Sequence, residues 1–238
     1  MPETIFCFKL ESFHNLRSFV KVSVSLIFCC FLENINSEMM FFFFSYYKEN
    51  LAAYVIAYSF YSILTSITVT FSATSNIMIS LYNGKGNLTD LVKIFWTLII
   101  DSTIIGVISL SILIPLRHVL INTEVKDKNI GNTAARYFTL LMIANYLDCL
   151  TEITSNSMKG LRRINTAFFL SLGINCLSVL SLYIGHYYLG GEGIIYGFIT
   201  NNIMYLFINF TALFFINWQK CIDDSARELH DDAAKLES

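Results

Sequence analysis

The chain has 238 residues, of which 55% are hydrophobic and only 14% are charged, against about 25% charged residues in soluble domains. The formal net charge of −2 excludes a strongly basic nucleic-acid-binding protein. The six cysteines form no CxxC pair and mostly lie in apolar stretches, so we expect neither a disulfide framework nor a zinc site.

Six apolar segments are long enough to cross a hydrocarbon core of about 30 Å. They predict an all-α, polytopic membrane protein with a lead-in over 1–18, a transmembrane lobe over 19–218 and a polar cytosolic tail over 219–238. The predicted spans are 19–46, 52–82, 92–115, 133–157, 166–189 and 193–217. The third span is expected to end at Pro115.

The first span carries two carboxylates, Glu33 and Glu38, between an apolar stretch and the four phenylalanines of 41–44. A carboxylate near the middle of a bilayer is costly, so it normally faces a protein cavity and often marks an ion or substrate path. Five residues along a helix give a projected separation of roughly 140°, so the two do not share one narrow face. We expect one of them to line a cavity and the other to face a neighbouring helix.

The second and third spans differ in polarity. The second is rich in serine and threonine over 58–75, and such residues either line a polar path or allow helices to pack closely. The sequence leaves both interpretations open. In the third span Asp101 is isolated, and we expect it to have a structural role near the cytosolic end of its helix.

The fourth span places Asn145, Asp148 and Glu152 at i, i+3 and i+7, on one face of a helix. That face must meet other helices or a wet cavity, because lipid cannot satisfy polar groups. Lining a cavity and bonding between helices remain equal alternatives for Asp148, whereas Glu152 is expected to bond between helices. The amides Asn201 and Asn202 of the sixth span are ambiguous in the same way.

Lysine and arginine are more frequent on the side of the N-terminal segment, the second-to-third loop, the fourth-to-fifth loop and the tail. The positive-inside bias therefore predicts that this side, with both termini, is cytosolic. The stretch NGKG at 83–86 lacks the spacing of a nucleotide-binding P-loop. No serine or cysteine triad is apparent, so we expect no enzymatic activity, no cofactor and no metal.

Four motifs resemble the second half of the multidrug and toxic compound extrusion (MATE) transporters, in collinear order over roughly residues 14–220. Residues 32–38 read LENINSE, against a family signature of the type Leu/Met-Glu-Trp-Trp-x-x-Glu. Residues 70–78 (TFSATSNIM) followed by YNGKGN at 82–87 resemble GFSxAxSxRVGNxLGAGN. Asp148 followed by SMKG at 157–160 resembles an acid ahead of a GVLRG turn, and NWQK at 217–220 resembles a closing NWxK.

The resemblance implies one six-helix lobe of a secondary active transporter that exports organic cations or xenobiotics in exchange for protons or sodium. It assigns ion and substrate binding to Glu33, Glu38 and Asp148 only. Asn145, Ser59 and Asn202 are possible cavity-lining residues. It also implies an integral protein of the plasma membrane or of a vacuole or vesicle membrane. A second copy of the chain or another half-lobe is the expected partner, because six spans make one lobe.

Several positions depart from the family pattern. The aromatic pair of the first motif is replaced by Asn34 and Ile35, the arginine of the second motif by Met78, and an acid by Ser59. These departures favour an alternative, a truncated or degenerate homologue that acts only as a membrane interaction subunit. A flippase for anionic lipid-linked substrates is a further alternative, although such carriers tend to line their cavity with basic residues.

Overall fold

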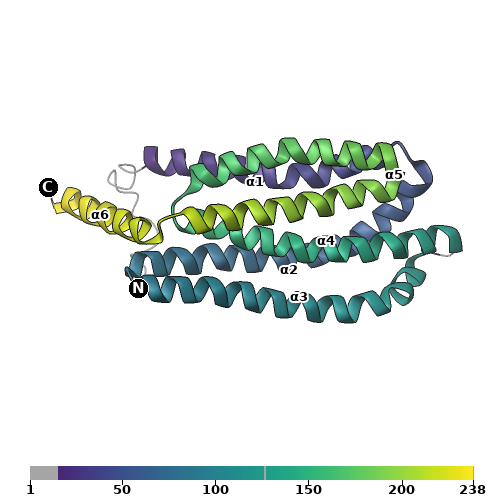
Figure 1. Ribbon diagram of the computed structural model, residues 1–238, viewed down its shortest axis with the longest axis horizontal. Coiled ribbons are helices and arrows are strands. Elements are labelled where there is room, and N and C mark those ends of the chain that lie inside the picture. Colours follow the sequence, from purple (N-terminus) through teal and green to yellow (C-terminus); the bar gives the residue numbers. More distant parts are fainter. Residues whose placement is uncertain (1–15, 126, 238) are drawn as a thin grey trace, which may run out of the picture.

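The structure is a computed structural model and describes residues 16–125 and 127–237 (Figure 1). The side chains of 48, 49 and 228–237 lie outside this description, as do several in the first part of the first helix, including those of 33 and 36. All regular elements in the described ranges are helices. They are α1 (Leu16–Phe44), α2 (Lys48–Lys85), α3 (Leu88–Glu124), α4 (Lys128–Gly160), α5 (Ile164–Phe215) and α6 (Trp218–Glu237).

The long helices lie side by side along one axis, and α6 leaves the bundle at one end (Figure 1). Helix α4 is central, because it packs against α2, α3 and α5, whereas α1 packs mainly on α5. We call the end that holds the α2–α3 turn, the α4–α5 turn and α6 the inner end. The charge bias of the sequence predicts that this end is cytosolic.

Local chemistry sets the tight turn between α2 and α3. Gly86 adopts a left-handed conformation (φ 77°) that glycine accepts without strain, and its N–H donates to the Asn83 carbonyl at 3.3 Å. Asn87 then caps α3, because its side-chain oxygen accepts from the backbone N–H groups of Thr89 and Asp90. The YNGKGN stretch is therefore a helix stop followed by a helix start.

Helix α5 spans 52 residues but is broken at Gly190 (φ 65°, ψ −139°) into two segments. The segments pack back to back, since a Cβ on Gly185 would collide with the Gly193 carbonyl. The hydroxyl of Ser181 donates to the Gly197 carbonyl across this contact at 3.2 Å. Helix α5 thus contains both the fifth and the sixth predicted spans.

Four described helices are long and apolar enough to cross a membrane: Leu26–Phe44, Asn50–Lys85, Leu88–Glu124 and Ile164–Phe215. Helix α4 contains the fourth predicted span but is not among them, because its sequence is rich in polar residues. The limits of the six spans in a bilayer, and the division into lead-in, lobe and tail, stay predictions.

Helix α3 continues past Pro115 to Glu124, so the helix is longer than the predicted third span, whose end in the bilayer stays a prediction. Proline lacks a backbone N–H and therefore leaves one upstream carbonyl without its helical donor. Membrane helices tolerate this where side chains supply replacement donors.

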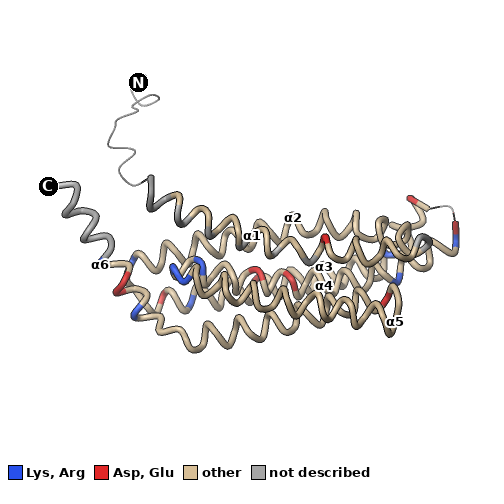
Figure 2. The backbone as a smooth tube through the Cα atoms, turned by 90° about the horizontal axis from the view of Figure 1, so that it is seen from above, with Lys and Arg blue, Asp and Glu red and all other residues tan. Residues whose placement is uncertain are grey.

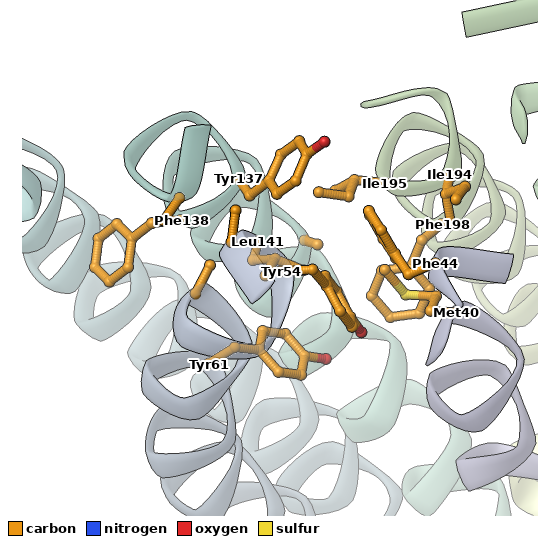
Figure 3. Close-up of a cluster of buried hydrophobic side chains, with 14 of the residues drawn as sticks. Met40, Phe44, Tyr54, Tyr61, Tyr137, Phe138, Leu141, Ile194, Ile195 and Phe198 are labelled. Atoms are coloured by element: carbon orange, nitrogen blue, oxygen red, sulfur yellow. The ribbon is translucent and has the colours of Figure 1, made fainter. Parts of the chain in front are cut away.

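The buried core has two parts. At the inner end, residues from the helix ends and turns, such as Ile79, Leu91 and Met158, pack with the start of α6. At the opposite end, aromatic residues from α1, α2 and α4 dominate, and Figure 3 shows Met40, Phe44, Tyr54 and others of this cluster. The Phe44 and Tyr54 rings stack with centroids 4.1 Å apart. The polar site described next lies between these two parts of the core.

Candidate functional site

An open polar cavity of ≈ 620 Å³ is lined by α1, α2, α4 and the second segment of α5. Its wall carries mostly hydroxyl, amide and charged side chains, which is unusual in a chain that is 55% hydrophobic. The volume lies within the range of about 300–1,000 Å³ that is common for small-molecule sites. The residues that contribute from α1 are Cys30, Asn34 and Ser37.

Asp148 lies at the deep side of this cavity, where the wall meets the aromatic part of the core. The Tyr61 hydroxyl donates to Asp148 Oδ2 at 3.4 Å. Tyr61 and Phe198 belong both to the cavity wall and to the buried aromatic cluster, so this cluster forms the floor (Figure 3). The carboxylate therefore lies against packed side chains on one side and open volume on the other.

One face of α4 supplies all the charged side chains that line the cavity in the part of the chain with described side chains: Asp148, Glu152 and Lys159. With Asn156 they follow at intervals of four, four and three residues, so they share a helical face roughly 16 Å long. Asn156 donates from Nδ2 to Glu152 Oε2 at 3.4 Å. In Figure 2 acidic positions occur midway along the bundle, whereas the basic positions gather toward its ends.

The candidates on α4 and α5 fall at different places. Asn202 lines the cavity and also donates from Nδ2 to the Ala144 carbonyl at 3.3 Å, which ties α5 to α4. Asn145 instead faces α2, where its amide donates to the Thr65 hydroxyl at 3.1 Å and accepts from the Thr68 hydroxyl at 3.4 Å. Asn145 lines a separate pocket of ≈ 50 Å³ between α2, α3 and α4.

The other candidates lie outside the cavity wall or outside the description. The Glu33 side chain is not among the described residues, although its neighbours by helical spacing, Cys30 and Ser37, line the cavity. Glu38 is exposed and is not part of the wall. Ser59 is also exposed, and its hydroxyl donates to the Val55 carbonyl of its own helix.

Sequence reasoning missed part of this wall. Tyr58, Tyr61 and Tyr205 face the cavity although tyrosines in an apolar helix carry no distinct signal. Glu152 lines the cavity, whereas the sequence suggested a bond between helices. Extending the spacing of Asp148 and Glu152 by two more steps reaches Asn156 and Lys159, and this longer stripe was the signal available in the sequence.

The family model MatE matches residues 25–184, which contain α2, α3, α4, most of α1 and the first part of α5. The chain belongs to this family. No curated protein sequence matches it significantly. The family assignment agrees with the motifs at 32–38, 70–87 and 148–160, which fall inside the matched range.

Two solved structures share the fold of this MATE chain. The eukaryotic MATE transporter AtDTX14 is 14% identical, with a TM-score of 0.83, over 93% of this chain and 51% of that chain. A MOP superfamily transporter from Pyrococcus furiosus is also 14% identical, with a TM-score of 0.73, over 82% of this chain and 44% of that one. The chain spans about half the length of these structures, and its all-α membrane fold is the one expected from the sequence.

Proposed function

We propose that the chain is one lobe of a secondary active transporter that exports organic cations or xenobiotics in exchange for protons or sodium. The observation that carries the proposal is the pair of carboxylates, Asp148 and Glu152, in the wall of a ≈ 620 Å³ cavity within an apolar bundle. Ionisable residues inside membrane-spanning regions are rare and commonly mark ion or substrate paths. Among the described side chains of the wall, the two carboxylates outnumber the single ammonium group of Lys159, so the cavity suits a ligand with a positive charge.

The roles of the individual acids follow from their positions. Asp148, held by Tyr61, is placed to meet the charge of a ligand or a coupling ion at the deep side of the cavity. We assign Glu33 as the main ion-coupled carboxylate, because its neighbours by helical spacing line the same wall. Glu38, which is exposed, has a supporting role at the boundary with a second lobe.

Transport needs a second wall. Alternating access generally works by rocking one repeat against another around a site near the bilayer midplane. We propose that a second lobe, from another copy of the chain or from a separate half, closes the cavity over its α1 and α2 side. The length match to about half of each solved structure supports this arrangement.

The test is export of a cationic dye from proteoliposomes that contain the full chain, driven by a pH gradient or by sodium. Wild type is expected to move the dye, and Glu33→Gln or Asp148→Asn to lower the initial rate about tenfold or more, since each removes a carboxylate to which we assign ion or substrate binding. Asp101→Asn is the matched control, because Asp101 is exposed on α3 and lies outside the cavity wall. Dye movement that is unchanged in both cavity variants would refute the assignment.

A second candidate is a membrane interaction subunit without transport activity. The observations in its favour are Ser59 in place of a family acid and the exposed position of Glu38 outside the cavity wall. Two measurements together separate the two functions: native mass spectrometry of the purified chain in nanodiscs gives its oligomeric state, and the dye assay gives its transport activity. A homodimer that moves dye supports transport, whereas a chain that moves no dye in any oligomeric state supports the subunit.

A further inference from the structure

A second polar pocket, of ≈ 310 Å³, lies at the inner end, where the α4–α5 turn meets the first half of α6. Its wall includes the guanidinium groups of Arg162, Arg163 and Arg227 and, among the side chains that the structure describes, one carboxylate, that of Asp224. The pocket is separate from the transport cavity, because the two share no lining residue. We call it the arginine pocket.

The backbone of the α4–α5 turn brings two of these arginines to the same pocket. Arg162 adopts a left-handed conformation (φ 60°), which is uncommon for a residue other than glycine. The N–H groups of Arg162 and Arg163 donate to the carbonyls of Lys159 and Met158, each at 3.0 Å. These bonds fix a sharp turn, so the two consecutive side chains project from a defined backbone.

Helix α6 is fastened against this turn at its first half. Arg163 donates from Nε to the Cys221 sulfur at 3.3 Å and from Nη2 to Asp224 Oδ2 at 3.4 Å. Asn83, at the end of α2, donates from Nδ2 to the Ser225 hydroxyl at 2.8 Å, and Ser225 is buried. The pocket is therefore lined by the α4–α5 turn and α6, it includes buried residues such as Ser225, and α2 holds α6 in place through Asn83.

We propose that the arginine pocket binds a phosphate group, carried either by the headgroup of an anionic phospholipid or by a soluble phosphorylated molecule. Guanidinium groups form paired, charge-assisted hydrogen bonds to phosphate oxygens. Arg163 keeps donors for a ligand, because a guanidinium has five N–H groups and only two of its nitrogens are engaged in the contacts above.

The position of the pocket suits a headgroup. The residues just before α6, Phe214 and Phe215, are 85% and 79% exposed, as expected for side chains that contact lipid. The pocket begins a few residues further along the chain, at Cys221, where apolar surface gives way to charged residues. Basic pockets at this level on the cytoplasmic side of membrane proteins commonly bind anionic headgroups. This inference concerns binding at the inner end and does not depend on transport.

The experiment reconstitutes the full chain in phosphatidylcholine nanodiscs with or without a phosphatidylinositol phosphate, and counts retained phosphoinositide by native mass spectrometry. Wild type is compared with the double variant Arg162→Asn and Arg227→Gln. Asparagine is chosen because it tolerates the left-handed backbone of Arg162. The matched control is Lys93→Gln with Lys220→Gln, which removes two exposed charges near the inner end outside the pocket. A parallel arm adds soluble inositol phosphate to the detergent-solubilised chain.

The affinity of the pocket variant for phosphoinositide is expected to fall about tenfold or more, because charge-assisted hydrogen bonds are lost. The lysine control is expected to bind phosphoinositide like wild type. Equal binding of soluble inositol phosphate assigns the site to a soluble ligand, and binding of the lipid alone assigns it to a headgroup. Equal loss in both double variants would overturn the proposal, because general interfacial charge would then explain the binding. Unchanged binding in the pocket variant would also overturn it. Arg227→Gln alone, at an exposed position, gives the same comparison if the double variant does not fold.

Discussion

At the scale of single residues, two adjacent buried amides in α5 have opposite surroundings. The side-chain amide of Asn202 donates to the Ala144 carbonyl, and the backbone carbonyl of Asn202 accepts from the Thr151 hydroxyl. Asn201 is also buried, but neither its amide nitrogen nor its amide oxygen has a hydrogen-bond partner among the described residues. An unpaired buried polar group lowers stability, whereas an apolar group of the same shape does not.

Asn201→Leu is therefore expected to leave stability unchanged or to raise it, and Asn202→Leu to lower it by about 1–2 kcal/mol, since the hydrogen bond from the Asn202 amide to the Ala144 carbonyl is lost. The measurement is thermal unfolding of the full chain in one detergent, with wild type, Asn201→Leu and Asn202→Leu side by side. The interpretation fails if Asn201→Leu is the more destabilising of the two variants.

Helical spacing in the sequence predicted which α4 residues share one face, but it did not predict the contacts between helices. Asp148 and Glu152 repeat at helical spacing, and this local pattern is enough to place them on one face. Tyr61, in contrast, reaches Asp148 from α2 across 87 positions of sequence, and no local pattern reports such a contact. Whether Asn145 faced the cavity or α2 also depended on the packing of neighbouring helices, which spacing alone does not define.

At the scale of helices, the break in α5 depends on Gly190. Its φ of 65° and ψ of −139° lie in a region that is essentially restricted to glycine. Gly190→Ala is expected to destabilise the chain by about 1–3 kcal/mol, because the side chain is strained in that conformation. Gly173→Ala is the matched control, since a Cβ there meets no atom within 4 Å, and in a helix it should be neutral or stabilising.

Thermal unfolding of the two glycine variants tests this role of Gly190. Equal stability of Gly190→Ala and wild type would show that the two segments of α5 do not need the break.

The sequence indicated a break in this region, since the predicted spans stopped at 189 and resumed at 193. It did not indicate that α3 passes Pro115, because a proline inside a membrane helix does not always end the helix.

At the scale of the whole molecule, the bundle has both a polar cavity and an exposed apolar surface, and we expect water in the first and lipid against the second. Cys30 is exposed and lines the cavity, whereas Cys176 is exposed on α5 beside apolar residues such as Leu172 and Leu180, which are also exposed. We expect a charged, water-soluble thiol reagent to modify a variant that retains only Cys30 faster than one that retains only Cys176. Labelling in nanodiscs, followed by mass spectrometry, measures both rates.

Equal labelling rates would contradict the assignment of the α1 side to an aqueous cavity. Denatured samples of both single-cysteine variants provide the control for intrinsic thiol reactivity.

The sequence predicted the all-α membrane fold, because helix length and apolar composition are properties of single segments. The cavity required knowledge of which helices are neighbours, and α1, α2, α4 and α5 are brought together only by the packing of the entire lobe.

The central claim is that the acid-bearing cavity binds organic cations, and binding tests it most directly. Tetraphenylphosphonium and tetraphenylborate have nearly the same shape and opposite charge, so their binding to the full chain in nanodiscs isolates the effect of charge. We predict saturable binding of the phosphonium ion, weakened about tenfold or more by Asp148→Asn, and no saturable binding of the borate ion above that of empty nanodiscs. Equal saturable binding of both ions, or phosphonium binding that is unaffected by Asp148→Asn, would contradict the claim.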